Sequence, residues 1–294
     1  MNIRKNRLKI VLGGIAVCMC MACGGSDTKD YWGDTSNGGK EEPTENPNAS
    51  KPRYIWIDAA ANFPDFANSK ENIARDLALA KDAGFTDIVV DVRPTTGDVL
   101  FKTNIVDQVK FMYAWIGSNY TKVERTATWD YLQAFVDEAR KQGLRIHAAI
   151  NTFVGGNQID GGTGLLYRDQ SKAEWATQMN MQTGIVSVMN TSESTKFFNP
   201  AHPEVQTFLC DLLKDLASYD LDGIFLDRGR FLNLQTDFSE ESRKQFEEYM
   251  GGIRIQNYPD DILLPGASSL PATYPKYLTK WLEFRAKVIY DFMQ

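Results

Sequence analysis

The sequence contains little cysteine and histidine and has no long hydrophobic run. Three of its four cysteines lie within residues 18–23, so only Cys210 remains in the rest of the chain. This excludes a disulfide framework. With two histidines and no HxH or HExxH pair, we also expect no zinc site. Cys210 falls on the apolar side of a helical pattern, which predicts a buried structural thiol instead of a nucleophile.

Basic residues are too few for a nucleic-acid-binding protein. Residues 1–23 hold four of the 32 Lys and Arg and none of the 38 Asp and Glu, so the remainder has 28 basic and 38 acidic side chains, a formal charge of −10. Binding to phosphates requires a basic face. We therefore expect no nucleic-acid partner.

The N-terminus has the pattern of an export signal. Basic residues precede a short apolar run over residues 10–17, and Ala22-Cys23-Gly24-Gly25 follows it. The run is too short to span a membrane. The pattern predicts a signal peptide over residues 1–23, with Cys23 resembling the lipidated cysteine of bacterial lipoproteins; a plain signal peptide that ends near a cysteine is the alternative. Residues 24–52 then read as a flexible tether, which predicts a protein lipid-anchored in the bacterial cell envelope, on the outer membrane.

Residues 53–294 alternate short apolar strands with amphipathic helices. Strands are predicted at 54–58, 87–92, 144–150 and 222–227, and helices at 69–83, 129–142, 203–219, 239–250 and 277–293. Such alternation indicates βαβ units and a parallel sheet. The segment that leads up to residue 190 is rich in methionine and is predicted to be partly helical.

Loop lengths favour a barrel over a doubly wound sheet. The strand-to-helix connections are longer than the helix-to-strand connections, as in an α/β protein of the (β/α)8 TIM-barrel type, whose functional loops follow the strand C-termini. No glycine-rich phosphate loop follows the first strand, which argues against dinucleotide binding. Four βα units occupy all of residues 53–294, so we expect only the N-terminal half of a barrel, truncated at its C-terminus.

Polar side chains at the strand ends form the candidate site. In chain order they are Asp58, Asp91, Arg93, His147, Asn151, Asp227, Arg228 and Arg230. Polar groups at the mouth of a barrel are the usual position of an active site. Two structural alternatives remain open: Asp91 and Arg93 could pair to brace the barrel, and His147 could be a hydrogen-bonded core residue. Asp227, which ends an apolar strand abruptly, is the strongest candidate for a direct role.

Other chemistries have less support in the residues. No GxSxG elbow accompanies a Ser-His-Asp triad. Asp58, Asp91 and Asp227 leave a Ca²⁺ or Mg²⁺ site open, but nothing else indicates a metal or another cofactor. The long loops are rich in aromatic residues, which are suited to stacking on sugar faces but as often form a small core of their own.

Four ordered motifs resemble those of a known family. They are IVVDVRPTTGD (88–98), GLRIHAAIN (143–151), FNPAHPEV (198–205) and DGIFLD (222–227). They are similar to the glycosyl-hydrolase-like family 10 of TIM-barrel lipoproteins, distant relatives of the α-amylase superfamily. The resemblance implies hydrolysis of a polysaccharide with Asp227 as the nucleophile, a partner acid from a later strand, and Arg93, His147 and Asn151 holding sugar hydroxyls or orienting the nucleophile. Phe225 departs from the amylase pattern, which has an arginine two residues before the nucleophile.

Three functions follow from these observations. The first is a surface-anchored glycoside hydrolase that acts on an extracellular polysaccharide or oligosaccharide. The alternative is a glycan-binding lipoprotein without turnover, and the third is a metal-assisted hydrolase. Glu240 and Glu241 are the nearest candidates by sequence for a second carboxylate beside Asp227. Because a half barrel would lack the partner acid, we expect no glycosidase activity from this chain alone.

Overall fold

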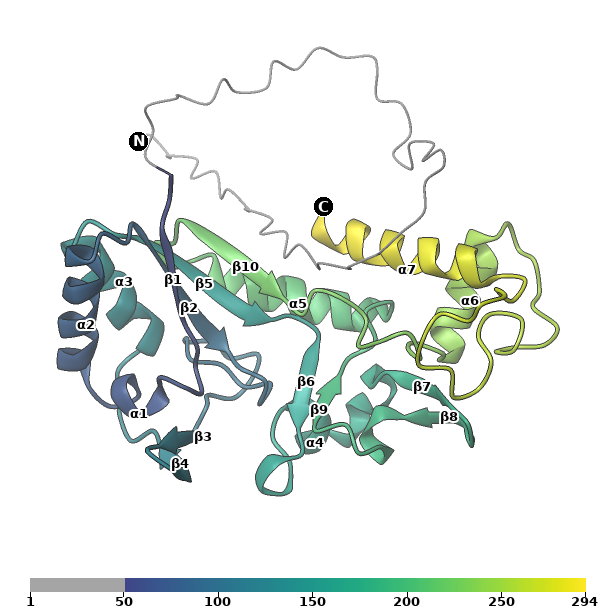
Figure 1. The fold of residues 1–294 in the computed structure, drawn as a ribbon, viewed down its shortest axis with the longest axis horizontal. Helices are drawn as coiled ribbons and strands as arrows, with labels where there is room; N and C mark the ends of the chain where they lie inside the picture. The colour runs from purple at the N-terminus through teal and green to yellow at the C-terminus, as the bar shows by residue number, and fades with distance from the viewer. Residues whose placement is uncertain (1–50) are drawn as a thin grey trace, which may run out of the picture.

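The computed structural model describes residues 51–294 (Figure 1). The predicted signal peptide, the lipidation site Cys23 and tether residues 24–50 lie outside the described residues. Among the described helices, none is long and apolar enough to cross a membrane.

A four-stranded parallel sheet forms the centre of the fold. Strands β1 (Tyr54–Ile57), β2 (Asp87–Arg93), β5 (Arg145–Asn151) and β10 (Gly223–Asp227) lie side by side in that order, and all three pairings are parallel. Their spatial order equals their chain order, so the sheet has no reversal of the kind found in doubly wound folds. The predicted α/β fold class of the (β/α) barrel type, with four βα units in the described residues, is confirmed.

The crossover helices α2 (Lys70–Asp82), α3 (Tyr131–Lys141) and α5 (Pro203–Leu216) accompany the sheet (Figure 1). Ser69 and Asp130 cap the first two, each accepting a hydrogen bond from a backbone N–H in the first turn. Alternate strand residues form the main core together with these helices: Ile57, Ile88, Val90, Ile146, Ala148 and Ile224. The other set of alternate strand residues therefore lies on the inner face, away from the helices.

The prediction for Cys210 was wrong, because its side chain is exposed on α5. The buried stripe of this helix consists of Val205, Phe208, Leu209, Leu212 and Leu216. Cys210 directly follows a residue of that stripe, and a step of about 100° along an α-helix turns it toward solvent.

The long connections contain small antiparallel sheets that the sequence reading did not predict. The loop after β2 forms the hairpin of β3 (Phe111–Ile116) and β4 (Asn119–Glu124). The loop after β5 contains β6 (Val154–Asn157) paired with β9 (Thr195–Phe197), and β7 (Gln178–Met181) paired with β8 (Gly184–Ser187). The methionine-rich segment up to residue 190 combines this last hairpin with helix α4 (Leu165–Arg168) and short 3₁₀ turns at Gln170–Trp175 and Val188–Asn190. The prediction of a partly helical segment is therefore confirmed, although its hairpin was not predicted.

Short helices and a second core complete the fold. Helices α1 (Phe63–Phe66) and α4 (Leu165–Arg168) are single turns within loops. After β10, α6 (Glu240–Tyr249) and α7 (Leu278–Met293) confirm the two predicted C-terminal helices. They enclose a core of their own that includes Phe246 and Trp281, whose rings meet edge to face at 4.9 Å.

Candidate functional site at the strand ends

Asp91 is the most unusual side chain on the inner face of the sheet. It is 7% exposed, and one carboxylate oxygen accepts a hydrogen bond of 3.2 Å from the backbone N–H of Arg93. Among the described residues, no lysine or arginine forms an ion pair with it. Burial raises the pKa of Asp91 to about 7, and the negative charges of Asp58 and Asp227 add to the rise. The site therefore contains a carboxyl group that keeps its proton close to neutral pH.

Asp58 lies beside Asp91 at the end of the neighbouring strand. Ile57 pairs with Val90, so the next residue on each strand is an aspartate. Asp58 is exposed, and its Oδ1 accepts a hydrogen bond of 2.7 Å from the backbone N–H of Ala61. The two carboxyl groups form a like-charged pair in which only one member is buried.

Asp227 ends β10 and is half-buried. Its Oδ1 accepts a hydrogen bond of 2.7 Å from the backbone N–H of Arg228, a residue that adopts the left-handed conformation at φ 49°. Its carbonyl oxygen accepts a second bond of 2.7 Å from the N–H of Thr152, which fixes the main chain at the strand end. Among the described residues, Oδ2 has no hydrogen-bond partner, so this oxygen is available to a ligand.

Arg228 and Arg230 turn toward the neighbouring strand β9. Their guanidinium carbons lie 6.0 Å and 5.9 Å from the ring centroid of Phe197. Arg230 also donates hydrogen bonds to the carbonyls of Phe231, at 3.0 Å, and Leu232. Within residues 51–294, neither arginine forms an ion pair with Asp227.

Arg93 binds main-chain carbonyl groups instead of a carboxylate. The β2–β5 pairing shifts by one residue between Asp91 and Arg93, which interrupts the simple alternation of faces. The fully buried guanidinium donates to the carbonyls of Asn151, Thr152 (3.2 Å) and Val154 (2.5 Å), and burial lowers its pKa to about 10. Asn151 completes the arrangement by donating to the carbonyl of Arg93 at 2.9 Å. Arg93 and Asn151 thus hold the turn that leads from β5 to β6.

His147 lies toward the other end of the sheet, away from the strand-end carboxylates. It pairs with Val89 and with Gly223, the first residue of β10. Its Nε2 lies 2.8 Å from Oδ1 of Asp87, and its ring contacts those of Tyr54 and Phe225 at 5.5 Å and 5.7 Å. These contacts are those of a hydrogen-bonded core histidine.

The sequence candidates for a second carboxylate are engaged within their own helix. Glu240 lies 3.6 Å from Arg243, and Glu241 accepts a hydrogen bond of 2.6 Å from Gln245. Asp91, which the sequence placed in the candidate site without a role as the second carboxylate, is the carboxyl group whose pKa responds to Asp227. Within residues 51–294, no group of three or more His, Cys, Asp or Glu side chains is arranged to hold a metal ion.

A cavity of about 340 Å³ adjoins the strand ends. Ala60 follows β1, and Thr95 and Thr96 follow β2; hairpin residues Phe111, Tyr113 and Tyr120 and loop residues Asn157 and Gln158 complete much of its wall. The cavity thus combines aromatic rings with hydroxyl and amide groups, a composition suited to a polar organic ligand.

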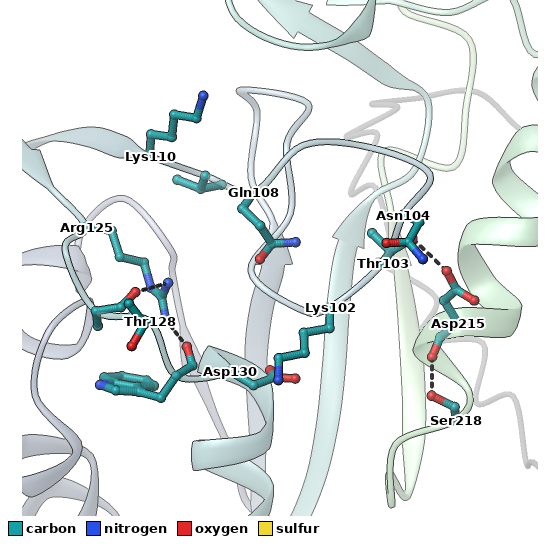
Figure 2. Close-up of a pocket in the computed structure, with 13 residues that line it drawn as sticks. Lys102, Thr103, Asn104, Gln108, Lys110, Arg125, Thr128, Asp130, Asp215 and Ser218 are labelled. Atoms are coloured by element: carbon teal, nitrogen blue, oxygen red, sulfur yellow. Dashed lines mark hydrogen bonds between the residues drawn. The ribbon is translucent and has the colours of Figure 1, made fainter.

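A larger cavity of about 810 Å³ lies beside α3 and α5 (Figure 2). Much of its polar lining is already paired: Thr103 donates to Asp215 at 2.6 Å, and Arg125 donates to the carbonyls of Ala127 and Trp129 at 2.8 Å and 2.5 Å. None of the strand-end aspartates lines it. These aspartates do not line the smaller cavity either, but Ala60, Thr95 and Thr96 of its wall follow the ends of β1 and β2 in the chain, so it is the cavity that adjoins the strand ends.

Comparison with known protein families shows the family to which this chain belongs. The family model described as "Glycosyl hydrolase-like 10" matches residues 51–294. The chain belongs to the glycosyl hydrolase-like 10 family. The resemblance inferred from the four motifs is thereby confirmed, and a glycan-related function follows for this family member.

Individual proteins similar to this glycosyl hydrolase-like 10 chain share between 13% and 31% of its residues over the matched regions. An S-layer-related protein of Niallia circulans is 31% identical over 246 residues, which cover 81% of this chain but 15% of that protein. α-L-Fucosidase isoenzyme 2 of Paenibacillus thiaminolyticus is 16% identical over 81% of this chain and 29% of its own, with a TM-score of 0.49. The catalytic domain of β-amylase from Paenibacillus polymyxa is 13% identical over 82% of this chain and 60% of its own, with a TM-score of 0.47.

Proposed function

We propose that this glycosyl hydrolase-like 10 protein is a glycoside hydrolase that acts on an extracellular polysaccharide. The observation that carries the proposal is Asp91, a buried carboxyl group that keeps its proton to about pH 7 near the accessible carboxyl group of Asp227. Glycoside hydrolysis uses two carboxyl groups, one that donates a proton to the leaving oxygen and one that acts on the opposite side of the sugar. Groups with different environments can take these two roles in one site.

In this proposal, Asp91 protonates the leaving oxygen, and Asp227 promotes the attack on the anomeric carbon from the opposite side of the sugar. Strand β5 lies between β2 and β10, which separates the two aspartate-bearing strands by about 10 Å. Such a spacing favours a water molecule between the carboxyl groups, with Asp227 as the base that activates it, over direct attack by Asp227. Asp91 would then take the part of the partner acid that the sequence reading expected from a later strand.

The test is the release of reducing ends by the purified full chain from a panel of soluble polysaccharides: hydroxyethyl cellulose, glucomannan, xylan and glycol chitin. Because Asp91 takes the part of the acid that was expected on a later strand, we expect turnover of at least one polysaccharide, in place of the inactivity expected from the sequence alone. The rate should fall about 10³-fold in Asp91→Asn and in Asp227→Asn, since each variant removes one of the two reacting carboxyl groups. Asp211→Asn is the matched control, because Asp211 lies on the surface of α5, where it forms an ion pair with Lys214. Inversion at the anomeric carbon, followed by NMR of the first product, is the expected stereochemistry.

Two other results would identify the competing functions. Binding of a panel polysaccharide without release of reducing ends would indicate a glycan-binding protein without turnover. Hydrolysis that is abolished by a chelator and restored by Mg²⁺ or Ca²⁺ would indicate a metal-assisted hydrolase. Full activity in both aspartate variants would contradict the catalytic roles.

We also propose that the protein acts at the cell surface, anchored through lipid on Cys23. The pattern of residues 1–23 supports export, and the name of the S-layer-related relative agrees with a surface position. We expect Cys23→Ser to move the protein from the membrane fraction to the soluble fraction of its native host or of a bacterium with the same lipoprotein pathway, as measured by immunoblot. An unchanged membrane fraction would exclude Cys23 as the anchor.

A further inference from the structure

One face of the β3–β4 hairpin has four aromatic rings in a row. Phe111, Tyr113 and Trp115 alternate along β3 and so share a face, and Tyr120 lies directly opposite Trp115 on β4. Successive ring centroids are 6.1 Å (Phe111–Tyr113), 5.4 Å (Tyr113–Tyr120) and 5.3 Å (Tyr120–Trp115) apart. We call these four residues the aromatic strip.

The aromatic strip faces outward and does not belong to the core. Trp115 is 67% exposed and Tyr120 is 54% exposed. Met112 and Ala114 alternate with the strip residues along β3. They are buried and form the inner side of the hairpin, and β3 contacts α1. Large rings gathered on a surface that has already buried its other face are typical of a binding site.

The strip adjoins the cavity at the strand ends. Phe111, Tyr113 and Tyr120 line this cavity of about 340 Å³ together with Ala60 and Thr96. Thr96 lies near the end of β2, and its buried hydroxyl oxygen has no hydrogen-bond partner within residues 51–294. That oxygen is enclosed by the protein, so the polar residues that a ligand continuing from the strip would meet in the cavity are Thr95, Asn157 and Gln158.

Two of the charges beside the aromatic strip, on Lys122 and Asp160, compensate each other, and Glu124, which pairs with Phe111 across the hairpin, adds a negative charge that disfavours an acidic ligand. Lys122, which pairs with Tyr113 across the hairpin, forms an ion pair of 2.5 Å with Asp160 and lies 4.0 Å from the ring centroid of Phe111. Its pKa is raised by the hydrogen bond to Asp160, and that of Asp160 is lowered by the same bond. Because the charges of Lys122 and Asp160 neutralise each other, the strip favours an uncharged ligand.

We propose that the aromatic strip is a binding platform for a single neutral glycan chain, which it leads into the strand-end cavity. This inference rests on the proposed function insofar as the ligand is a glycan. Residues 111–115 span about 13 Å along β3, enough for more than one pyranose ring. The planes of Tyr113 and Tyr120 differ by 30°, and those of Tyr120 and Trp115 by 45°, so the rings fit a twisted single chain and cannot all lie on a flat crystalline surface.

The experiment is affinity electrophoresis of the full chain in gels that contain hydroxyethyl cellulose, glucomannan, xylan or glycol chitin. We expect retardation by at least one of them, with an affinity about tenfold weaker in Trp115→Ala and in Tyr120→Ala because each loses a stacking ring. Tyr290→Ala is the matched control, since this tyrosine is 62% exposed on α7, outside the strip. Circular dichroism confirms that the variants remain folded.

Several outcomes would overturn the platform. They are no retardation in any of the four gels, equal retardation of the strip variants and the control, and stronger binding to microcrystalline cellulose than to the soluble chains. Failure of the proposed hydrolysis is distinguishable, because it abolishes the release of reducing ends while retardation still depends on Trp115. Hydrolysis with an unchanged KM in Trp115→Ala would refute the platform alone.

Discussion

Asp87 and Asp91 lie on the same strand and the same face, four residues apart, and both are buried, with exposures of 0% and 7%. Burial alone would raise the pKa of both. For Asp87, hydrogen bonds from Arg145, Thr86 and His147 outweigh that effect and hold the pKa below its ordinary value. Asp91 has no cationic partner within residues 51–294 and has two aspartates near it, so burial and these charges raise its pKa to about 7. The partners of a buried carboxylate, more than its depth, decide whether it stabilises the fold or keeps a proton for chemistry.

The pH dependence of stability gives the largest test of this contrast. The folded state keeps the proton of Asp91 to about pH 7, whereas the unfolded chain releases it near the ordinary pKa of 3.8. Between these values the folded state binds more protons, so the contribution of Asp91 to the free energy of unfolding falls as the pH rises, by up to about 4 kcal/mol. Urea titrations at pH 5 and pH 8 should show this fall in the parent and a smaller one in Asp91→Asn. Equal pH dependence in the two proteins would refute the raised pKa.

Removal of the charge at Asp87 should cause the next largest change in the free energy of unfolding. The contribution of Asp87 depends on pH in the opposite way to that of Asp91. Asp87→Asn breaks the bond to Arg145, whose nitrogens lie 2.7 Å from the carboxylate, and weakens the contact with His147. We expect a loss of about 3 kcal/mol in unfolding free energy at pH 7.5. Because the pKa of Asp87 is lowered, its contribution is present above the pKa of the unfolded chain and is lost as the pH falls through the lower folded value.

Arg145→Gln is the control for that variant and should have the smallest effect. The arginine side chain is 53% exposed, but it pairs with a carboxylate that is fully buried and is the first of the hydrogen-bond donors that lower the pKa of Asp87. Glutamine can still donate a hydrogen bond to that carboxylate, so a loss of about 1.5 kcal/mol, smaller than that of Asp87→Asn, is expected. If Asp87→Asn lost as little unfolding free energy as Arg145→Gln, the hydrogen bonds of Asp87 would not be what stabilises this end of the sheet.

The sheet and its helices were predictable because their signals are local. Continuous apolar runs marked the four strands, and Ser69 and Asp130 begin their helices as caps of the expected type. The hairpin β3–β4 was missed although Phe111, Tyr113 and Trp115 alternate with smaller or apolar residues before a turn at Gly117, a pattern that predicts a strand and a hairpin.

The roles within the site were less predictable because they depend on register. A one-residue shift in the β2–β5 pairing separates the surroundings of Asp91 and Arg93, and such a shift leaves no mark in a single sequence. His147 lies four residues before Asn151, so its distance from the strand end could be read from the sequence, but its contact with Asp87 could not, because that contact depends on how β2 pairs with β5. The raised pKa of Asp91 required knowledge of which aspartates come together across three strands.

The two ends of the β3–β4 hairpin lie close together. The backbone N–H of Arg125 donates to the carbonyl of Lys110 at 2.8 Å, just outside the two strands, so the hairpin is closed at its base. A Cβ atom at Gly117 in its turn would meet nothing within 4 Å. If the aromatic strip is the binding platform proposed above, residues 111–124 could be exchanged for another hairpin of the same base width, which would change the ligand preference while the aspartates at the strand ends stay in place.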